Sequence, residues 1–172
     1  MKGIVLYCSQ TGFTKRYAEW IAQALGFDCA PAGKQKAAAL SLYDAVVFGS
    51  WVRAGSLVSA AQFARLLPRL PCKKVAVFGV GARPADAVSL AVVEKAFPKE
   101  RFPSLGRFYF PGGMCYEKMG GLSRKMLQTY AKMLKKQKEP GEETRKILEF
   151  LGTSFDCTNR EALRPLFDFL KG

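Results

Sequence analysis

The sequence has no histidine in its 172 residues. Histidine is the commonest metal ligand and the side chain that most readily exchanges a proton near neutral pH. Zinc enzymes are therefore not expected, nor are enzymes that activate a serine or cysteine through histidine. We predict no metal site, and no catalytic acid or base stands out.

Paired cysteines are also missing. The chain has an odd number of cysteines, mostly set among apolar residues, and no two of them form a C-x-x-C pair. This usage indicates a reducing compartment and structural rather than reactive thiols. The five cysteines are Cys8, Cys29, Cys72, Cys115 and Cys157.

Long hydrophobic runs are absent as well. No apolar run approaches the roughly 20 residues that a membrane-spanning helix requires. Met1-Lys2-Gly3 leads directly into a strand-like segment that is too short for a signal sequence. We therefore predict a cytoplasmic protein whose residues 1–172 form a single domain, since 49% hydrophobic residues are enough to bury a core.

Acidic residues are scarce. The chain has 27 Lys plus Arg against 14 Asp plus Glu, a formal charge of +13. Such a charge attracts anionic partners, whether phosphate ligands, nucleic acid or a membrane surface. No motif for specific nucleic-acid recognition accompanies it.

Short apolar runs alternate with helical patterns along the chain. Near-continuous apolar strands that alternate with helices indicate an α/β protein, a doubly wound parallel sheet of five strands with helices on both faces. Ligands of such sheets bind beyond the carboxyl ends of the strands. The predicted strands are 3–8, 27–30, 45–49, 74–79 and 108–110, and the predicted helices include 17–25, 58–67, 88–97 and 162–170.

An insertion at about 114–152 precedes the last helix. It holds a helical stretch at 122–138, a break at Glu139-Pro140-Gly141 and a second helical stretch at 142–151. From Lys118 to Lys138 there are seven basic residues and no acidic one, with apolar residues at helical spacing. This basic amphipathic helix is expected to lie against an anionic membrane, to cover one edge of the ligand site, or to dock with a solvated basic face.

The loop after the first strand has the composition of an anion site. Three hydroxyls and a glycine occur within six residues where a helix begins, and helix N-termini attract phosphate. An ordinary N-cap is the alternative interpretation. Neither the Walker motif nor the G-x-G-x-x-G fingerprint is present. The loop consists of Ser9, Gln10, Thr11, Gly12, Phe13 and Thr14.

This loop resembles the FMN-phosphate loop of the flavodoxin family, [ST]-x-T-G-x-T, at every fixed position. The resemblance implies FMN as cofactor, bound through its phosphate by residues 9–14. It also implies a flavodoxin-like sheet with strand order 2-1-3-4-5.

Two further loops resemble the menaquinone-dependent protoporphyrinogen oxidase branch of that family. The first begins at Gly49 and continues through Ser50, Trp51, Val52, Arg53, Ala54 and Gly55, with Ala54 where the branch usually has an aromatic residue. The second contains Gly79, Val80, Gly81, Ala82 and Arg83, followed by Pro84. The resemblance implies that residues 50–55 and 79–83 contact the cofactor.

Three side chains in these loops carry the predicted ligand chemistry. Trp51 is expected either to stack on the flavin ring or to pack against the sheet. Arg53 and Arg83 are expected to stabilise negative charge on the reduced flavin, or else to line solvated loops. Met119, Met126 and Met133 are predicted to be packing residues rather than part of a binding groove.

The predicted function is that of an FMN-binding oxidoreductase similar to protoporphyrinogen oxidases, with a quinone acceptor and peripheral contact with an anionic membrane. A first alternative is an electron carrier that serves redox-partner proteins. A second is a flavin-free module that binds phosphate or polyanions.

Overall fold

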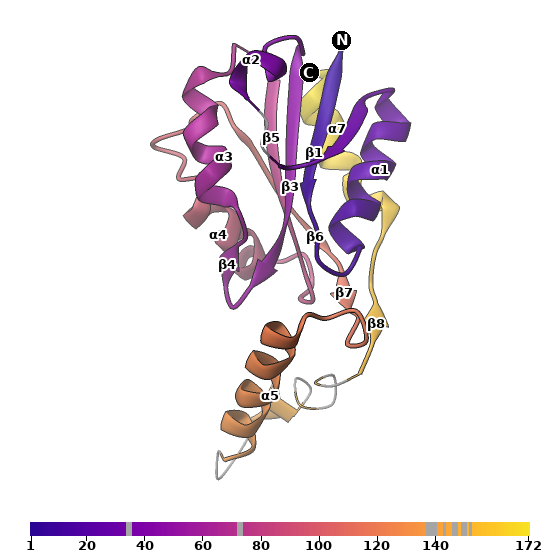
Figure 1. Ribbon diagram of the computed structural model, residues 1–172, viewed down its shortest axis with the longest axis vertical. Helices are drawn as coiled ribbons and strands as arrows, with labels where there is room; N and C mark the ends of the chain where they lie inside the picture. The colour runs from indigo at the N-terminus through magenta and orange to yellow at the C-terminus, as the bar shows by residue number, and fades with distance from the viewer. Residues whose placement is uncertain are drawn as a thin grey trace.

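A parallel sheet in the order β2–β1–β3–β5–β6 forms the centre of the computed structural model (Figure 1). The predicted fold class and strand order are confirmed. The five strands are β1 (Gly3–Cys8), β2 (Asp28–Pro31), β3 (Ala45–Arg53), β5 (Lys74–Gly81) and β6 (Gly106–Pro111). The structure describes residues 1–33, 36–71, 74–136, 141–142, 144–145, 148, 151 and 153–172.

The sheet is buried on both faces because successive side chains of a strand point to opposite sides. Val5 of β1 is paired with Val47 of β3, and both lie in one hydrophobic cluster. The next pair, Leu6 and Phe48, lies in the other cluster. This explains why the strand sequences are apolar throughout rather than alternating.

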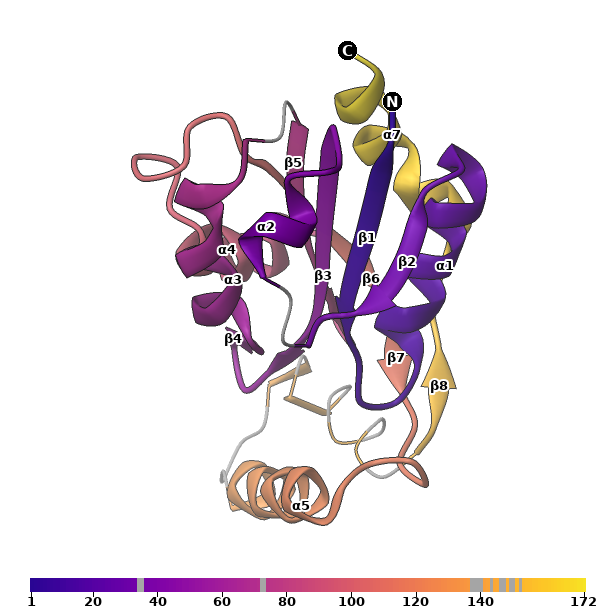
Figure 2. The ribbon, with the colours of Figure 1, turned by 45° about the horizontal axis from the view of Figure 1, so that its top comes forward.

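Helices cover each face of the sheet (Figures 1 and 2). The helices α1 (Phe13–Leu25) and α7 (Arg164–Lys171) pack on one side, where the 3-10 turn η2 (Arg160–Leu163) precedes α7. On the other side lie α2 (Ala37–Leu40), α3 (Ala60–Leu66), the 3-10 turn η1 (Leu67–Arg69) and α4 (Ala87–Ala96).

The predicted loop at 49–55 is mostly strand. β3 continues to Arg53 and turns back into the antiparallel strand β4 (Ser56–Leu57). The turn residues Ala54 and Gly55 have φ values of 47° and 71°, the conformation of a tight two-residue hairpin. The sequence did not indicate a hairpin here because alanine, unlike glycine, seldom adopts the backbone conformation that Ala54 has in this turn. Gly79 to Gly81 likewise belong to β5, so that predicted loop starts later than expected.

The insertion lies beyond the carboxyl ends of the strands (Figures 1 and 2). The short strands β7 (Gly113–Met114) and β8 (Phe155–Asp156) pair antiparallel and bring its two ends together. Between them lies helix α5 (Gly121–Lys135), which confirms a helix there but ends it before Lys138. Lys138, two of the three residues of the predicted break and half of the second predicted helix at 142–151 lie outside the described residues.

Polar contacts with α1 anchor the returning end of the insertion. The Arg16 guanidinium forms an ion pair with Asp156 and donates to the Thr158 hydroxyl at 2.9 Å. The Tyr17 hydroxyl donates to the carbonyl of Pro111 at 2.6 Å and accepts from the amide of Asn159 at 2.8 Å. Burial raises the pKa of Tyr17, so its hydroxyl keeps its proton and both bonds. The insertion is therefore tied to the helix that starts at the first predicted loop.

The cysteines are less buried than their sequence context suggested. Cys8 and Cys115 are partly buried, whereas Cys29 and Cys157 are exposed, and these four are free thiols. Cys72 lies outside the described residues. Cys29 lies in the edge strand β2 and Cys157 directly follows β8, which explains why both are exposed.

Candidate functional site

The first predicted loop forms the turn between β1 and α1. Ser9, Thr11 and Phe13 are partly buried there, and Thr14 is almost completely buried. The Ser9 hydroxyl accepts a hydrogen bond from the Gly12 amide at 3.1 Å, which folds the loop back on itself. Three hydroxyls are thus gathered at the start of a 13-residue helix.

Gly12 occupies the N-cap position of α1 with a φ of 103°. Residues with a β-carbon rarely adopt such a conformation, so the loop requires glycine here. A glycine cap has no side chain, and α1 receives no side-chain cap hydrogen bond. The amides of the first helical turn, at the positive end of the helix dipole, are therefore available to an anion. The ordinary Ser or Thr N-cap is not what this loop forms.

The second predicted loop forms the end of β3 and its hairpin turn. Trp51 and Val52 are partly buried, and Arg53 is exposed. The Arg53 guanidinium lies over the Trp51 ring, 5.6 Å from its centroid, a cation–π arrangement. The ring predicted to stack on a flavin and the cation predicted to face it therefore form one unit.

The third predicted loop joins β5 to α4. Arg83 lies 4.0 Å from Asp86, the N-cap residue of α4. A hydrogen bond from the Ser89 amide, with help from the Arg83 charge, holds the pKa of Asp86 below its usual value. The Tyr109 hydroxyl donates to the Arg83 carbonyl at 3.2 Å, and burial raises the pKa of that tyrosine. The loop is thus held at Arg83 through both its backbone carbonyl and its side chain.

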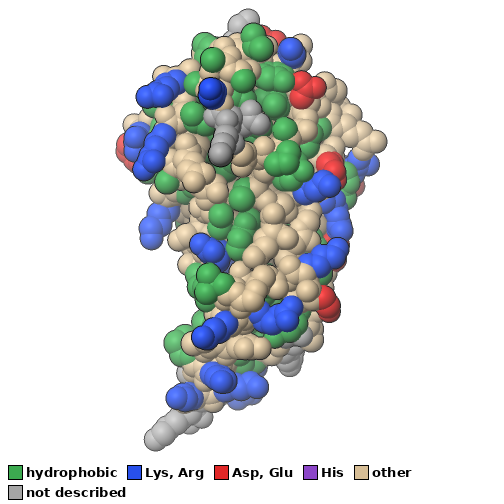
Figure 3. Space-filling view, viewed as in Figure 1, with side chains coloured by type: hydrophobic (Ala, Val, Ile, Leu, Met, Phe, Trp, Pro, Cys, Tyr) green, Lys and Arg blue, Asp and Glu red, His purple; other side chains and the backbone are tan. Residues whose placement is uncertain are grey.

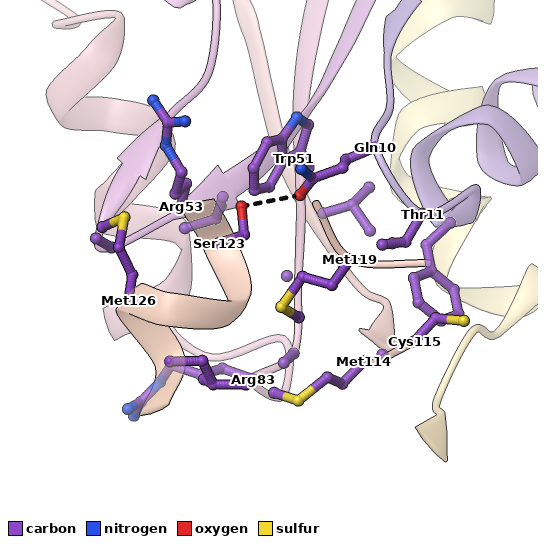
Figure 4. Close-up of a pocket in the computed structure, with 18 of the residues that line it drawn as sticks. Gln10, Thr11, Trp51, Arg53, Arg83, Met114, Cys115, Met119, Ser123 and Met126 are labelled. Carbon is purple, nitrogen blue, oxygen red and sulfur yellow. Dashed lines mark hydrogen bonds between the residues drawn. The ribbon is translucent and has the colours of Figure 1, made fainter. Parts of the chain in front are cut away.

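The three loops and the insertion enclose a cavity of about 870 Å³ (Figure 4). Small-molecule sites commonly occupy about 300–1,000 Å³, so the cavity is large enough for a nucleotide-sized ligand with space beyond it. The predicted site residues that line it are Ser9, Gln10, Thr11, Phe13, Thr14, Trp51, Val52, Arg53, Ala54, Gly55, Val80, Gly81, Ala82 and Arg83.

Three predicted site residues do not line the cavity. The Ser50 hydroxyl is fully buried and donates to the Val58 carbonyl at 2.6 Å, where it fastens the β3–β4 hairpin. Gly79 faces Val93 of α4 inside the core. Gly12 shapes the predicted phosphate loop through its backbone but is not among the lining residues.

The insertion supplies a further wall of the cavity, which is one of the three placements expected for its basic helix. Met119, Met126 and Met133 line the cavity, so their prediction as packing residues is wrong. Met126 and Met133 are 42% and 57% exposed, because the adjacent space is a cavity rather than a packed core. Their seven-residue spacing, which places side chains on one side of a helix, was the available signal. The other lining residues are Gly113, Met114, Cys115, Ser123, Leu127, Thr129, Tyr130, Leu151 and Phe155.

A hydrogen bond joins the insertion to the first loop. The Ser123 hydroxyl on α5 donates to Gln10 Oε1 at 3.3 Å across the cavity (Figure 4). Gly120, just before α5, also lies against the Gln10 amide group. The helix therefore covers the cavity and is fastened at the predicted phosphate loop.

The arrangement suits a ligand with a phosphate at one end and a flat ring at the other. The phosphate would lie at the N-terminus of α1 among the hydroxyls of Ser9, Thr11 and Thr14. Trp51 offers an aromatic surface to a ring, and Arg53 and Arg83 are the charged lining residues that the structure describes. Among the described residues, no cluster of metal-ligating side chains occurs.

Several solved flavoprotein structures resemble the chain at low identity. Flavodoxin 2 from Bacillus cereus is 25% identical with a TM-score of 0.48, over 64% of this chain and 83% of that one. A flavoprotein in complex with FMN from Lactobacillus acidophilus NCFM is 15% identical with a TM-score of 0.45, over 64% and 90%. A WrbA-like flavodoxin from Agrobacterium tumefaciens is 23% identical with a TM-score of 0.41, over 48% and 60%. The match thus spans less than two thirds of the WrbA-like protein.

A search of the curated proteins found no match. The family model that describes the flavodoxin domain matches residues 4–140, which include all three loops and α5. Together with the glycine-capped anion site, this match supports FMN as the ligand of the cavity, and the chain belongs to the flavodoxin family.

Proposed function

We propose that this protein is an FMN-dependent oxidoreductase whose substrate binds between the cofactor and α5. The observation that carries the proposal is the cavity of about 870 Å³, which continues from the three loops to the methionine-rich side of α5. An electron carrier needs only an exposed flavin edge for its protein partners. A covered space beside the flavin loops is instead what a small-molecule substrate requires.

The chain's own residues have distinct tasks in this proposal. Ser9, Thr11 and Thr14 hold the FMN phosphate with the first-turn amides of α1. Trp51 and Arg53 orient the ring and favour negative charge on it. When bound, FMN supplies the capacity to accept electrons from a substrate and release them to an acceptor.

The insertion would bind the substrate and exclude water. Met119, Met126 and Leu127 present flexible apolar surface, which adapts to bulky ligands. Protoporphyrinogen fits this chemistry, since it is large and mostly apolar and carries carboxylates that would face Arg53 or Arg83. A quinone fits the apolar part alone and is the proposed acceptor.

The first experiment loads the purified protein with FMN, removes the excess and measures the flavin absorbance. The loaded protein is then given protoporphyrinogen and a quinone, and porphyrin fluorescence is followed. Retained flavin and turnover would support the full proposal. Retained flavin with exchange of electrons only with redox proteins would favour the carrier alternative. A protein that retains no FMN would contradict both and leave a flavin-free phosphate site.

A matched variant sharpens this experiment. Leu127→Gln places a polar side chain on the part of the cavity wall that α5 provides, one helical turn beyond Ser123. We expect FMN retention to be unchanged and KM for the organic substrate to rise several-fold. Equal effects on FMN retention and KM would contradict the division of the cavity into two parts.

A further inference from the structure

Helix α5 presents two different surfaces side by side. Within this fully described helix only Leu134 is buried, while Leu122 is 68% exposed, Met126 42%, Tyr130 42% and Met133 57%. At 100° per residue, Leu122, Met126 and Met133 fall within a narrow strip along the helix. We call these three residues the apolar strip. A water-exposed strip of this kind indicates a contact with something outside the chain.

Lysines border the apolar strip on the side away from the buried Leu134. No acidic residue lies between Lys118 and Lys136. These lysine side chains gather at the end of the molecule formed by α5, beside hydrophobic ones (Figure 3). The exposed lysines of this segment are Lys118, Lys125, Lys132, Lys135 and Lys136, and of these Lys125, Lys132 and Lys136 lie beside the strip at 100° per residue.

Two of the three residues of the apolar strip lie at the mouth of the cavity. Met126 and Met133 are exposed to solvent and at the same time line the cavity, as does Tyr130. Whatever covers the strip therefore meets the entrance to the proposed substrate site. Each of the described helices is too short or too polar to span a bilayer.

We propose that α5 lies in the surface of an anionic lipid bilayer, with the apolar strip among the acyl chains and the lysines at the headgroups. This combination of apolar strip and flanking lysines is the pattern of an interfacial helix. Nucleic acid would attract the lysines but gain nothing from the apolar strip. A second copy of the chain would bring like charges together. Resting on the proposed function, the orientation opens the cavity toward the lipid, so an apolar acceptor enters from the membrane.

Flotation with lipid vesicles tests this orientation on the FMN-loaded protein. We expect binding to vesicles of phosphatidylcholine mixed with phosphatidylglycerol, no binding to phosphatidylcholine alone, and a loss of binding at high salt. Lys125→Gln with Lys132→Gln should weaken binding more than tenfold, since each lysine near an anionic surface contributes about fivefold. Leu122→Ser should weaken it several-fold without a change in charge.

The matched control is Lys95→Gln with Lys99→Gln. Both lysines are exposed and outside the cavity lining; Lys95 lies in the last turn of α4, and Lys99 follows that helix. The control should bind vesicles like the unchanged protein. Flavin absorbance checks that each variant is folded.

Several outcomes would overturn the membrane assignment. These are no binding to the anionic vesicles, an equal loss in the control, or no effect of Leu122→Ser. Self-association that is abolished by Leu122→Ser would assign the strip to a second copy instead. Vesicle binding is also measured without FMN, so failure of the oxidoreductase proposal appears as lost turnover while vesicle binding persists.

Discussion

The central sheet and α5 use apolar residues in opposite ways. In β1, β3 and β5 the apolar side chains are packed on both faces, and Val5, Val46, Val47, Ala76 and Val77 are fully or almost fully buried. In α5 the apolar residues Leu122, Met126 and Met133 face a cavity or solvent. Apolar burial in the sheet therefore stabilises the fold, whereas the exposed apolar side of α5 adds little to the core.

The largest expected effect tests this difference directly. Phe48 is 1% exposed and stacks on Phe63 with ring centroids 4.4 Å apart. Phe48→Ala should lower the free energy of unfolding by about 3–5 kcal/mol, because it leaves a cavity in a closed core. Met126→Ala should lower it by less than about 1 kcal/mol. Urea unfolding of both variants measures the comparison, and similar losses would mean that α5 is part of the core.

A second prediction concerns the point where the two regions meet. Gly12→Ala must hold alanine at a φ of 103°, which costs about 1–3 kcal/mol. The strain falls on the phosphate loop, so FMN affinity should drop about tenfold. Gly121→Ala, at the start of α5, is the matched control and should leave the affinity unchanged. Fluorescence titration with FMN gives both affinities, and unchanged binding by Gly12→Ala would argue against this loop as the phosphate site.

The charge of the cavity provides the third prediction. Arg53→Gln removes a cation beside Trp51. The reduction potential of bound FMN should fall by about 30 mV, equivalent to about 1.4 kcal/mol for two electrons, because the negative charge on the reduced flavin loses the nearby Arg53 cation. Arg65→Gln, on the exposed side of α3, should not shift it. Spectroelectrochemistry measures the potentials, and equal shifts in the two variants would indicate only the overall charge of the protein.

A smaller effect is expected at the contact between α5 and the first loop. Ser123→Ala removes the hydrogen bond to Gln10, which is worth about 0.5–1.5 kcal/mol. Amide hydrogen exchange in α5 should become several-fold faster while exchange in β3 stays the same. Thr129→Ala is the control, since its hydroxyl donates within the helix, to the Lys125 carbonyl. Acceleration of α5 exchange in the control alone would contradict the role of the Gln10 contact.

The smallest expected effect is the pH dependence of the insertion's anchor. Burial acts to raise the pKa of Asp156, but hydrogen bonds from Arg16 and Thr158 outweigh it and hold that pKa below 3.8. The folded state therefore gains stability from this carboxylate above about pH 3.8, and loses it as the pH falls through the lowered value. The side chain is 46% exposed, so the gain is less than about 1 kcal/mol.

Asp156→Asn is the variant that tests this anchor. It should make thermal unfolding slightly less dependent on pH in acid. Glu161→Gln, which alters another exposed carboxylate paired with an arginine, is the comparison. A larger change in Glu161→Gln than in Asp156→Asn would show that the anchor does not carry the acid sensitivity.

Local patterns carried most of the fold prediction. Runs such as residues 4–6 and 75–78 are apolar at every position because a strand covered on both faces has no polar side, and this property is visible without a partner strand. The six-residue anion loop is equally local, since hydroxyls, glycine and helix start lie together in the chain. The β3–β4 hairpin was missed because its turn uses Ala54, where the local signal favours other conformations.

The sequence by itself determined the α/β class, the strand order through its family resemblance, the glycine-containing turn at residues 9–14 and the basic amphipathic helix. Each of these features depends on residues that are close together in the chain or that form a recognisable sequence motif. Only the tertiary structure decided that α5 covers the cavity, that its methionines line it, and that Ser50 is used inside the hairpin. Those features depend on contacts between segments that are distant in the chain, such as Gln10 with Ser123 and Arg16 with Asp156. A local periodicity of apolar residues does not specify which distant segment will pack against it.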